Sequence, residues 1–188
     1  MKKKLLLCFL LLWVILPGCQ TREDPVEQAL ELRSRLVSSD GYTFDAEITA
    51  DFGDKVYEFG MGCQADSGGN LSFTVTAPQS IAGITGRIDG QGGKLTFDDK
   101  ALAFELLAEG RLSPVSGPWV LVHTLHFGYI TSCAQAENGV TVYINDSYED
   151  EALNLSVYLG SDGLPTGAEI FWQGSRVLSL TVRNFIFQ

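Results

Sequence analysis

The sequence predicts an α+β, β-rich fold in which a curved antiparallel sheet forms an unclosed half-barrel capped by helices. An amphipathic helical segment comes first, and a series of short segments with alternating apolar and polar residues follows it. Most of these segments have one apolar and one polar face. A long sheet with a single apolar face must curve over a cover that removes this face from water.

The first predicted element is a helix that begins at Asp24 and Pro25. Asp is a typical N-cap residue, Pro suits the first helical position, and Glu27 stands where the acid of a capping box belongs. Apolar residues then recur at roughly helical spacing as far as Ser38, and residues 39–41 end the helix. We therefore expect an amphipathic helix of about three turns.

The segments after this helix predict strands joined by tight turns. Each alternates apolar with polar side chains, and most are separated by turns that contain glycine, which favours antiparallel pairing. The strands are predicted over residues 43–52, 57–64, 71–77, 86–89, 94–98, 101–107, 140–145, 153–159, 168–173 and 176–187.

Residues 116–129 interrupt this series. Ser116, Gly117 and Pro118 resemble a helix start, and the apolar run 119–127 is long enough for a buried helix. The β-branched residues in the run favour a strand as the alternative. We predict a helix that, together with the first one, covers the apolar face of the sheet. No internal repeat or linker divides the chain, so residues 25–188 are expected to form a single domain.

The first nineteen residues have the pattern of an export signal. Lys2 to Lys4 precede an apolar run, Leu5–Leu16, which is too short to span about 30 Å of hydrocarbon as a helix. Cys19 after Leu-Pro-Gly resembles the lipobox of bacterial lipoproteins, in which a lipid is attached to the cysteine sulfur. We therefore expect residues 1–18 to be a lipoprotein signal peptide, Cys19 to be lipidated, and residues 19–24 to form a tether. A plain secretory peptide and an uncleaved anchor are the alternatives.

The charge of the chain excludes several classes of partner. Without the three lysines of the signal, the 13 Lys and Arg fall to ten, against 23 Asp and Glu. Such an acidic chain argues against binding to nucleic acid and against electrostatic docking on anionic lipid. Attachment to the membrane is therefore expected to come from the lipid on Cys19.

Two cysteines remain after the signal and the lipidation site. Cys63 and Cys133 would lie in an oxidising or thiol-poor compartment, where a disulfide between them is one possibility. Two separate buried thiols are the other. The chain has no Cys-x-x-Cys pair, which argues against redox catalysis.

The residues that carry chemistry favour a protein without catalytic activity, cofactor or metal. His123 and His126 are three residues apart in the predicted helix, but no Cys or carboxylate lies near them in the sequence to complete a metal site. The acidic residues at 146–151 lack the ligand spacing of a calcium loop and are interpreted as a solvated turn. No Gly-x-Ser-x-Gly or phosphate-binding loop is present in the sequence.

Aromatic residues gather on the apolar faces of the predicted strands. Phe59, Met61, Phe73 and Phe97 are candidates for the lining of a hydrophobic cavity, because a curved, unclosed sheet often leaves one. A fully packed core is the alternative.

Several parts of the sequence carry a family resemblance. Besides the opening helix, they are the strand Phe44–Ala50, the run Phe73–Pro78 followed by residues 81–83, and the closing run from Leu164 through residues 168–170 to residues 182–185. In this order they resemble the LolA/LolB/LppX-like family of envelope lipoproteins and lipoprotein carriers. The fold of that family is a curved, unclosed β-barrel with helices capping an apolar cavity.

The resemblance implies a non-enzymatic, extracytoplasmic protein, anchored to the bacterial cell membrane through Cys19. It implies that the protein binds a hydrophobic ligand such as a lipid or acyl chain, or a lipidated client, in its half-barrel. A branch of the family in spore-forming Gram-positive bacteria, the germination lipoproteins, suggests an alternative. In that case the chain would be an interaction module for an envelope protein such as a cell-wall amidase.

Overall fold

The computed structural model of the protein describes residues 24–51, 53, 55–88, 96–97 and 112–188. The expected signal peptide, Cys19 and most of the expected tether lie outside the described residues, as does the strand expected over residues 101–107.

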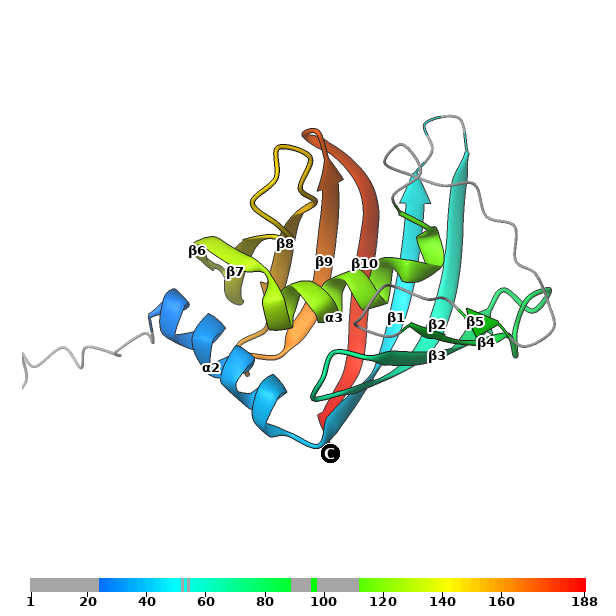
Figure 1. Ribbon diagram of the computed structural model, residues 1–188, viewed down its shortest axis with the longest axis horizontal. Helices are drawn as coiled ribbons and strands as arrows, with labels where there is room; N and C mark the ends of the chain where they lie inside the picture. The colour runs from blue at the N-terminus through cyan, green and yellow to red at the C-terminus, as the bar shows by residue number, and fades with distance from the viewer. Residues whose placement is uncertain (1–23, 52, 54, 89–95, 98–111) are drawn as a thin grey trace, which may run out of the picture.

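Ten strands form one sheet in the described part of the chain. They are β1 (Gly41–Asp51), β2 (Val56–Asp66), β3 (Leu71–Ala77), β4 (Thr85–Ile88), β5 (Thr96–Phe97), β6 (Tyr129–Ala136), β7 (Gly139–Asn145), β8 (Asn154–Leu159), β9 (Pro165–Trp172) and β10 (Ser175–Phe187). Their order across the sheet is β5-β4-β3-β2-β1-β10-β9-β8-β7-β6, and every neighbouring pair is antiparallel. Within the described residues the outer strands β5 and β6 do not pair with each other. The sheet is therefore an open, curved half-barrel, as the sequence predicts (Figure 1).

The centre of the sheet joins the first strand to the last. Strand β1 pairs with β10 from Tyr42 opposite Phe187 to Ala50 opposite Leu178. On its other edge β1 pairs with β2 along its whole length. Strands β1 to β5 therefore form one half of the sheet, strands β6 to β10 form the other half, and the pair β1–β10 connects them.

The alternation of apolar and polar residues along each strand gives the sheet one buried and one exposed face. In β1 the side chains of Phe44, Ala46 and Ile48 are buried, whereas those of Asp45 and Glu47 are exposed. The same alternation in the neighbouring strands gives a continuous hydrophobic core on the concave side. The one-sided sheet expected from the sequence is confirmed.

Helix α2 (Pro25–Ser38) begins as predicted. The Asp24 side chain accepts a hydrogen bond from the N–H of Val26 at 2.9 Å, and Pro25 stands in the first turn of the helix. The helix packs at the β6–β7 end of the sheet. Its buried residues, at spacings of three and four, are Ala29, Leu32 and Leu36.

The second half of the chain contains one helix that was predicted and one strand that was not. Residues 117–127 are helical, so the interpretation of this apolar run as a helix is correct. Strand β6 was missed, because its side chains are mostly exposed and its pairing with β7 shifts between Ile130 and Ser132. A shifted, exposed strand shows no regular alternation in the sequence.

Cys63 and Cys133, which both lie in the described part of the chain, are free thiols. Cys63 lies on β2 and Cys133 on β6, with β1, β10, β9, β8 and β7 between them in the sheet. The structure thus holds the two thiols apart, with Cys63 buried and Cys133 partly exposed. Burial raises the pKa of both thiols, which lowers the fraction of each that is present as the reactive thiolate at neutral pH.

Candidate functional site

Helix α3 (Gly117–Phe127) crosses the concave side of the sheet (Figure 1). A single 3₁₀ turn at Pro114–Ser116 leads into it, and the helix contacts β7, β8 and β10. Most of its residues are buried, as expected for a helix that is apolar nearly all round. This helix forms one wall of the candidate site.

The C-terminal end of α3 is held by a side chain from α2. The Arg33 guanidinium donates through Nε to the carbonyl of Leu125 at 2.8 Å, and through Nη2 to the carbonyl of Gly128 at 2.9 Å. A longer bond of 3.4 Å reaches the carbonyl of Thr124. The last carbonyls of a helix lack partners within the helix and carry partial negative charge, so a cation stabilises them. Arg33 thereby fixes the position of α3 over the sheet.

A buried hydrogen bond connects α3 to β1. The hydroxyl of Tyr42 lies 3.0 Å from Nε2 of His126, and both side chains are buried. The Tyr42 ring stacks on Phe185 with centroids 5.0 Å apart. Burial raises the pKa of Tyr42 and, together with the positive charge of Arg33, lowers the pKa of His126. His126 is therefore a buried, neutral histidine that pairs with Tyr42.

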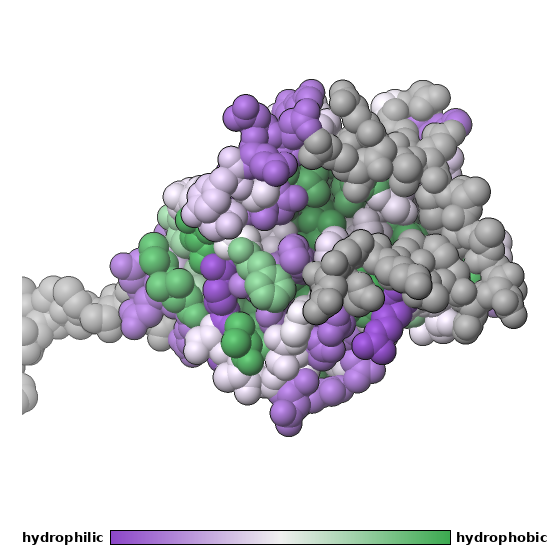
Figure 2. Space-filling view, in the orientation of Figure 1, coloured by the Kyte–Doolittle hydropathy of each residue, from purple (hydrophilic) through white to green (hydrophobic). Residues whose placement is uncertain are grey.

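A hollow of about 380 Å³ lies beside α3. Helix α3 and the segment before it form one side, and the β7–β8 loop with the start of β8 forms the other. In the space-filling view, hydrophobic surface is recessed above α3, with hydrophilic residues beside it (Figure 2). The lining residues are Leu112, Ser116, Trp119, Val120, His123, Thr124, Asp146, Glu151 and Leu153. Apolar and polar groups therefore line the same hollow.

Three polar atoms at this hollow are buried without a hydrogen-bond partner among the described residues. They are Nε1 of Trp119, Nδ1 of His123 and Oγ1 of Thr124. Trp119 and His123 stack with their ring centroids 4.9 Å apart, and Thr124 is fully buried one turn along the helix from Val120. Buried polar atoms are nearly always hydrogen-bonded in native proteins. A ligand with a polar group would satisfy atoms of this kind.

Two ionisable side chains in the lining of the hollow have pKa values shifted by burial. Burial lowers the pKa of His123, and the nearby Asp146 acts against this effect. Burial also raises the pKa of Asp146, although its Oδ1 accepts a hydrogen bond from the N–H of Leu153 at 2.8 Å. His123 is therefore neutral at pH 7, and it lies beside the carboxyl groups of Asp146 and Glu151 in the lining of the hollow.

The two histidines predict a loss of stability in mild acid. Their pKa values in the folded protein lie below the ordinary value of 6.5, so the unfolded chain binds more protons as the pH falls below this value. The free energy of unfolding is therefore expected to decrease between pH 7.5 and pH 5.5, as measured by urea denaturation. The variant His126→Gln is expected to show a smaller pH dependence. An equal pH dependence in this variant would contradict the assignment to His126.

The cavity residues predicted from the sequence lie elsewhere. Phe59, Met61 and Phe73 stand close together on β2 and β3, but they are only 5%, 1% and 3% exposed and belong to the packed core. The side chain of Phe97 lies outside the described residues. None of the other three lines the hollow beside α3. Of the residues considered from the sequence for metal binding, His123, Asp146 and Glu151 do line it.

Two larger hollows lie along β1, β2, β3 and the end of β10. Their volumes are about 840 and 790 Å³. Phe73 contributes to the first, and Phe59 and Met61 contribute to the second. The remaining lining consists largely of Thr, Ser, Asp and Glu side chains and of glycines that carry no side chain, Gly60 and Gly62 among them. Apolar and polar groups therefore line these two hollows as well.

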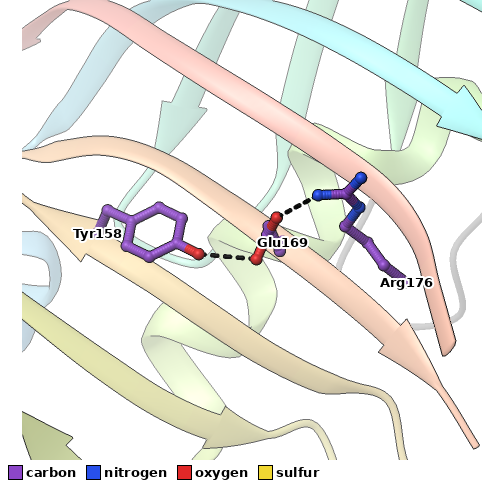
Figure 3. A network of polar contacts seen from close by, with 3 residues as sticks. All are labelled: Tyr158, Glu169 and Arg176. Carbon is purple, nitrogen blue, oxygen red and sulfur yellow. Dashed lines mark hydrogen bonds and ion pairs between the residues drawn. The ribbon is translucent and has the colours of Figure 1, made fainter. Parts of the chain in front are cut away.

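One polar network links three neighbouring strands. Glu169 on β9 accepts a hydrogen bond from the hydroxyl of Tyr158 at 2.7 Å and forms an ion pair with Arg176 at 2.6 Å (Figure 3). These two donors lower the pKa of Glu169. Burial, and then the bond to Glu169, raises the pKa of Tyr158 to about 12. The carboxylate is therefore ionised and fully engaged, which suits cross-strand pairing rather than acid–base chemistry.

Two kinds of feature are absent from the described part of the chain. No group of three or more His, Cys, Asp or Glu side chains there is arranged to hold a metal ion. No helix there is long and apolar enough to cross a membrane.

No protein-family model and no curated protein matches the sequence. Among solved structures, the chain is similar to an uncharacterized conserved protein from Thermus thermophilus, with 11% identity, a TM-score of 0.43 and 88% of each chain covered. It is also similar to a LolA superfamily protein from Nitrosomonas europaea, with 10% identity and a TM-score of 0.44 over 88% of this chain and 94% of that one. A third is a putative outer membrane lipoprotein-sorting protein domain from Vibrio parahaemolyticus, with 10% identity and a TM-score of 0.40 over 87% and 92%. A LolA superfamily protein is thus one of the structures to which the chain is similar in overall fold.

Proposed function

We propose that the protein is a non-enzymatic, lipid-anchored envelope protein that binds an amphiphilic ligand with an acyl chain in the hollow beside α3. The observation that carries the proposal is the combination of an apolar wall with three polar atoms that have no partner among the described residues. Leu112, Val120 and Leu153 supply apolar surface for a hydrocarbon chain. The indole N–H of Trp119 and the hydroxyl of Thr124 supply hydrogen bonds for a carbonyl or hydroxyl group at its head.

The size and position of the hollow agree with this role. Its volume of about 380 Å³ falls within the range of about 300–1,000 Å³ typical of small-molecule sites. It opens on the concave side of a half-barrel whose inner face is hydrophobic. The proposed lipid on Cys19 would keep the protein at a bilayer, where ligands with acyl chains are found.

The variant Thr124→Val tests the proposal, because it separates binding from stability. Valine has the shape of threonine without the hydroxyl, and this hydroxyl has no partner within the described structure. We expect affinity for a fluorescent fatty acid to fall about three- to tenfold, the equivalent of one hydrogen bond of about 1 kcal/mol. The free energy of unfolding should stay unchanged or rise by up to about 1 kcal/mol. Fluorescence titration and urea denaturation of the mature, unlipidated chain measure the two quantities.

Thr181→Val is the matched control, because Thr181 is an exposed threonine of β10 outside the hollow. It should leave the affinity unchanged. Equal affinities of Thr124→Val and the parent chain would show that Thr124 does not contact the head group. A folded parent chain that binds no acyl probe would contradict the proposed function and favour the alternative of an interaction module for a cell-wall enzyme.

A further inference from the structure

Helix α2 has an apolar side that is about half exposed in the described structure. Val26, Leu30 and Val37 are 46%, 53% and 56% exposed. Their separations of four and seven residues place them on one side of the helix, away from the buried residues Ala29, Leu32 and Leu36.

The end of α3 extends this surface. Arg33 stands on the same side of α2, between Leu30 and Val37, and binds the carbonyls of Leu125 and Gly128. These two residues flank Phe127, whose side chain is 53% exposed. Hydrophobic surface is visible over α2 and beside the end of α3 from one viewpoint (Figure 2). We call Val26, Leu30, Val37 and Phe127 the α2 apolar face.

The polar side of α2 points in another direction. Gln28, Glu31 and Arg35 line a small polar hollow together with the turn at residues 161–163. Glu31 follows Leu30 directly in the chain, so the two side chains are separated by slightly more than a quarter of a turn around the helix. The helix therefore has an apolar exposed side and a polar exposed side, with the sheet behind them.

The α2 apolar face lies close in sequence to the proposed anchor. Only five residues, Gln20 to Asp24, separate Cys19 from Pro25. Fully extended, a linker of this length spans about 20 Å at most. A lipid on Cys19 would therefore hold the first turn of α2 within about 20 Å of the bilayer surface, at a high effective concentration.

We propose that the α2 apolar face rests on the lipid bilayer. This inference depends on the lipidation of Cys19, which is part of the proposed function. The chain after the signal has 23 acidic against ten basic residues, so the contact would be apolar insertion among lipid head groups rather than attraction to anionic lipid.

This contact would orient the whole domain. Helices α2 and α3 both lie in front of the sheet in Figure 1, and the hollow beside α3 is visible from the same side as the α2 apolar face in Figure 2. Docking through α2 therefore turns the concave side of the half-barrel towards the membrane. A ligand with an acyl chain could then pass between bilayer and hollow without crossing the far side of the protein.

The variant Leu30→Trp tests the inference, with Glu31→Trp as its matched control. Both positions are exposed and nearly equally distant from Cys19 along the chain, but they lie on different sides of α2. Each lipidated variant is placed in phosphatidylcholine vesicles that carry bromine on their acyl chains, a quencher of tryptophan emission. The emission of the parent, from Trp119 and Trp172, is subtracted. We expect Leu30→Trp to show blue-shifted emission and to lose most of it to quenching, whereas Glu31→Trp keeps most of its emission.

Equal quenching of the two variants would overturn the inference. Sedimentation that shows a dimer through this face, with no selective quenching, would also overturn it and assign the face to a second copy of the chain. Mass spectrometry that finds no lipid on Cys19 would overturn it together with the anchored part of the proposed function. Selective quenching in a chain that fails to bind the acyl probe would leave the docking intact and contradict only the ligand-binding role.

Discussion

Replacing Arg33 by alanine is expected to lower the free energy of unfolding by about 2–3 kcal/mol, because the change removes charged hydrogen bonds to three carbonyls at the end of α3. These bonds connect α2 to α3 and hold the wall of the proposed binding hollow. Urea denaturation followed by circular dichroism measures the change. We also expect weaker binding of the acyl probe, since α3 loses a fixed position.

Arg35→Ala is the control for charge and helix propensity. Arg35 lies on the same helix two residues later and makes a cation–π contact with Phe187. The distance between its guanidinium carbon and the ring centroid is 4.4 Å. Removing it should cost about 1 kcal/mol or less. Arg33→Lys should give an intermediate loss, because an ammonium group cannot reproduce the forked geometry of a guanidinium. Equal losses in the two alanine variants would contradict the specific role of Arg33.

Replacing Gly128 by alanine is the second change with a large expected effect. A Cβ atom at this position would lie 2.6 Å from the carbonyl oxygen of Thr124 and 2.8 Å from Cγ2 of Ile144. The φ angle of −69° is open to any residue, so the cost is steric rather than conformational. We expect a loss of about 2–3 kcal/mol in the free energy of unfolding, the upper part of the range for overpacked cores.

Gly62→Ala is the matched control for Gly128→Ala. The nearest atom to a Cβ at Gly62 is a carboxylate oxygen of Asp45 at 3.8 Å, and the position has no positive φ angle. Alanine there is expected to change the free energy of unfolding by less than about 0.5 kcal/mol. A small loss at Gly128, similar to that at Gly62, would show that α3 can shift freely over the sheet.

Much of the fold follows from local patterns in the sequence. Asp24 and Pro25 predict the start of α2 because capping depends on neighbouring residues alone. The alternation of Phe44, Ala46 and Ile48 predicts a strand with one buried face for the same reason. Strand β6 escapes this kind of prediction, since it lies at the edge of the sheet and contains an irregularity in its pairing. The pairing of β1 with β10 escapes it too, because no local pattern records which distant strands become neighbours.

The candidate site could be predicted only in part. Trp119, His123 and Thr124 share one helix, but Asp146 and Leu153 reach the hollow from a loop about 20 residues later, and no spacing in the sequence connects them. Phe59, Met61 and Phe73, expected to line a cavity, belong to the buried core and contribute to two hollows along β1, β2 and β3 rather than to the hollow beside α3. Periodicity shows which face of a strand is apolar, whereas the packing of that face depends on which element covers it.

The pairing of β1 with β10 has a consequence for when the protein can fold during and after synthesis. Tyr42 pairs with Phe187, which is synthesised almost last. The two halves of the sheet therefore cannot join until almost all of the described chain has left the ribosome. Contacts between such distant residues also form slowly. A chain threaded through a translocation channel with its N-terminus first would therefore cross in an unfolded state. It would complete its sheet only on the far side of the membrane.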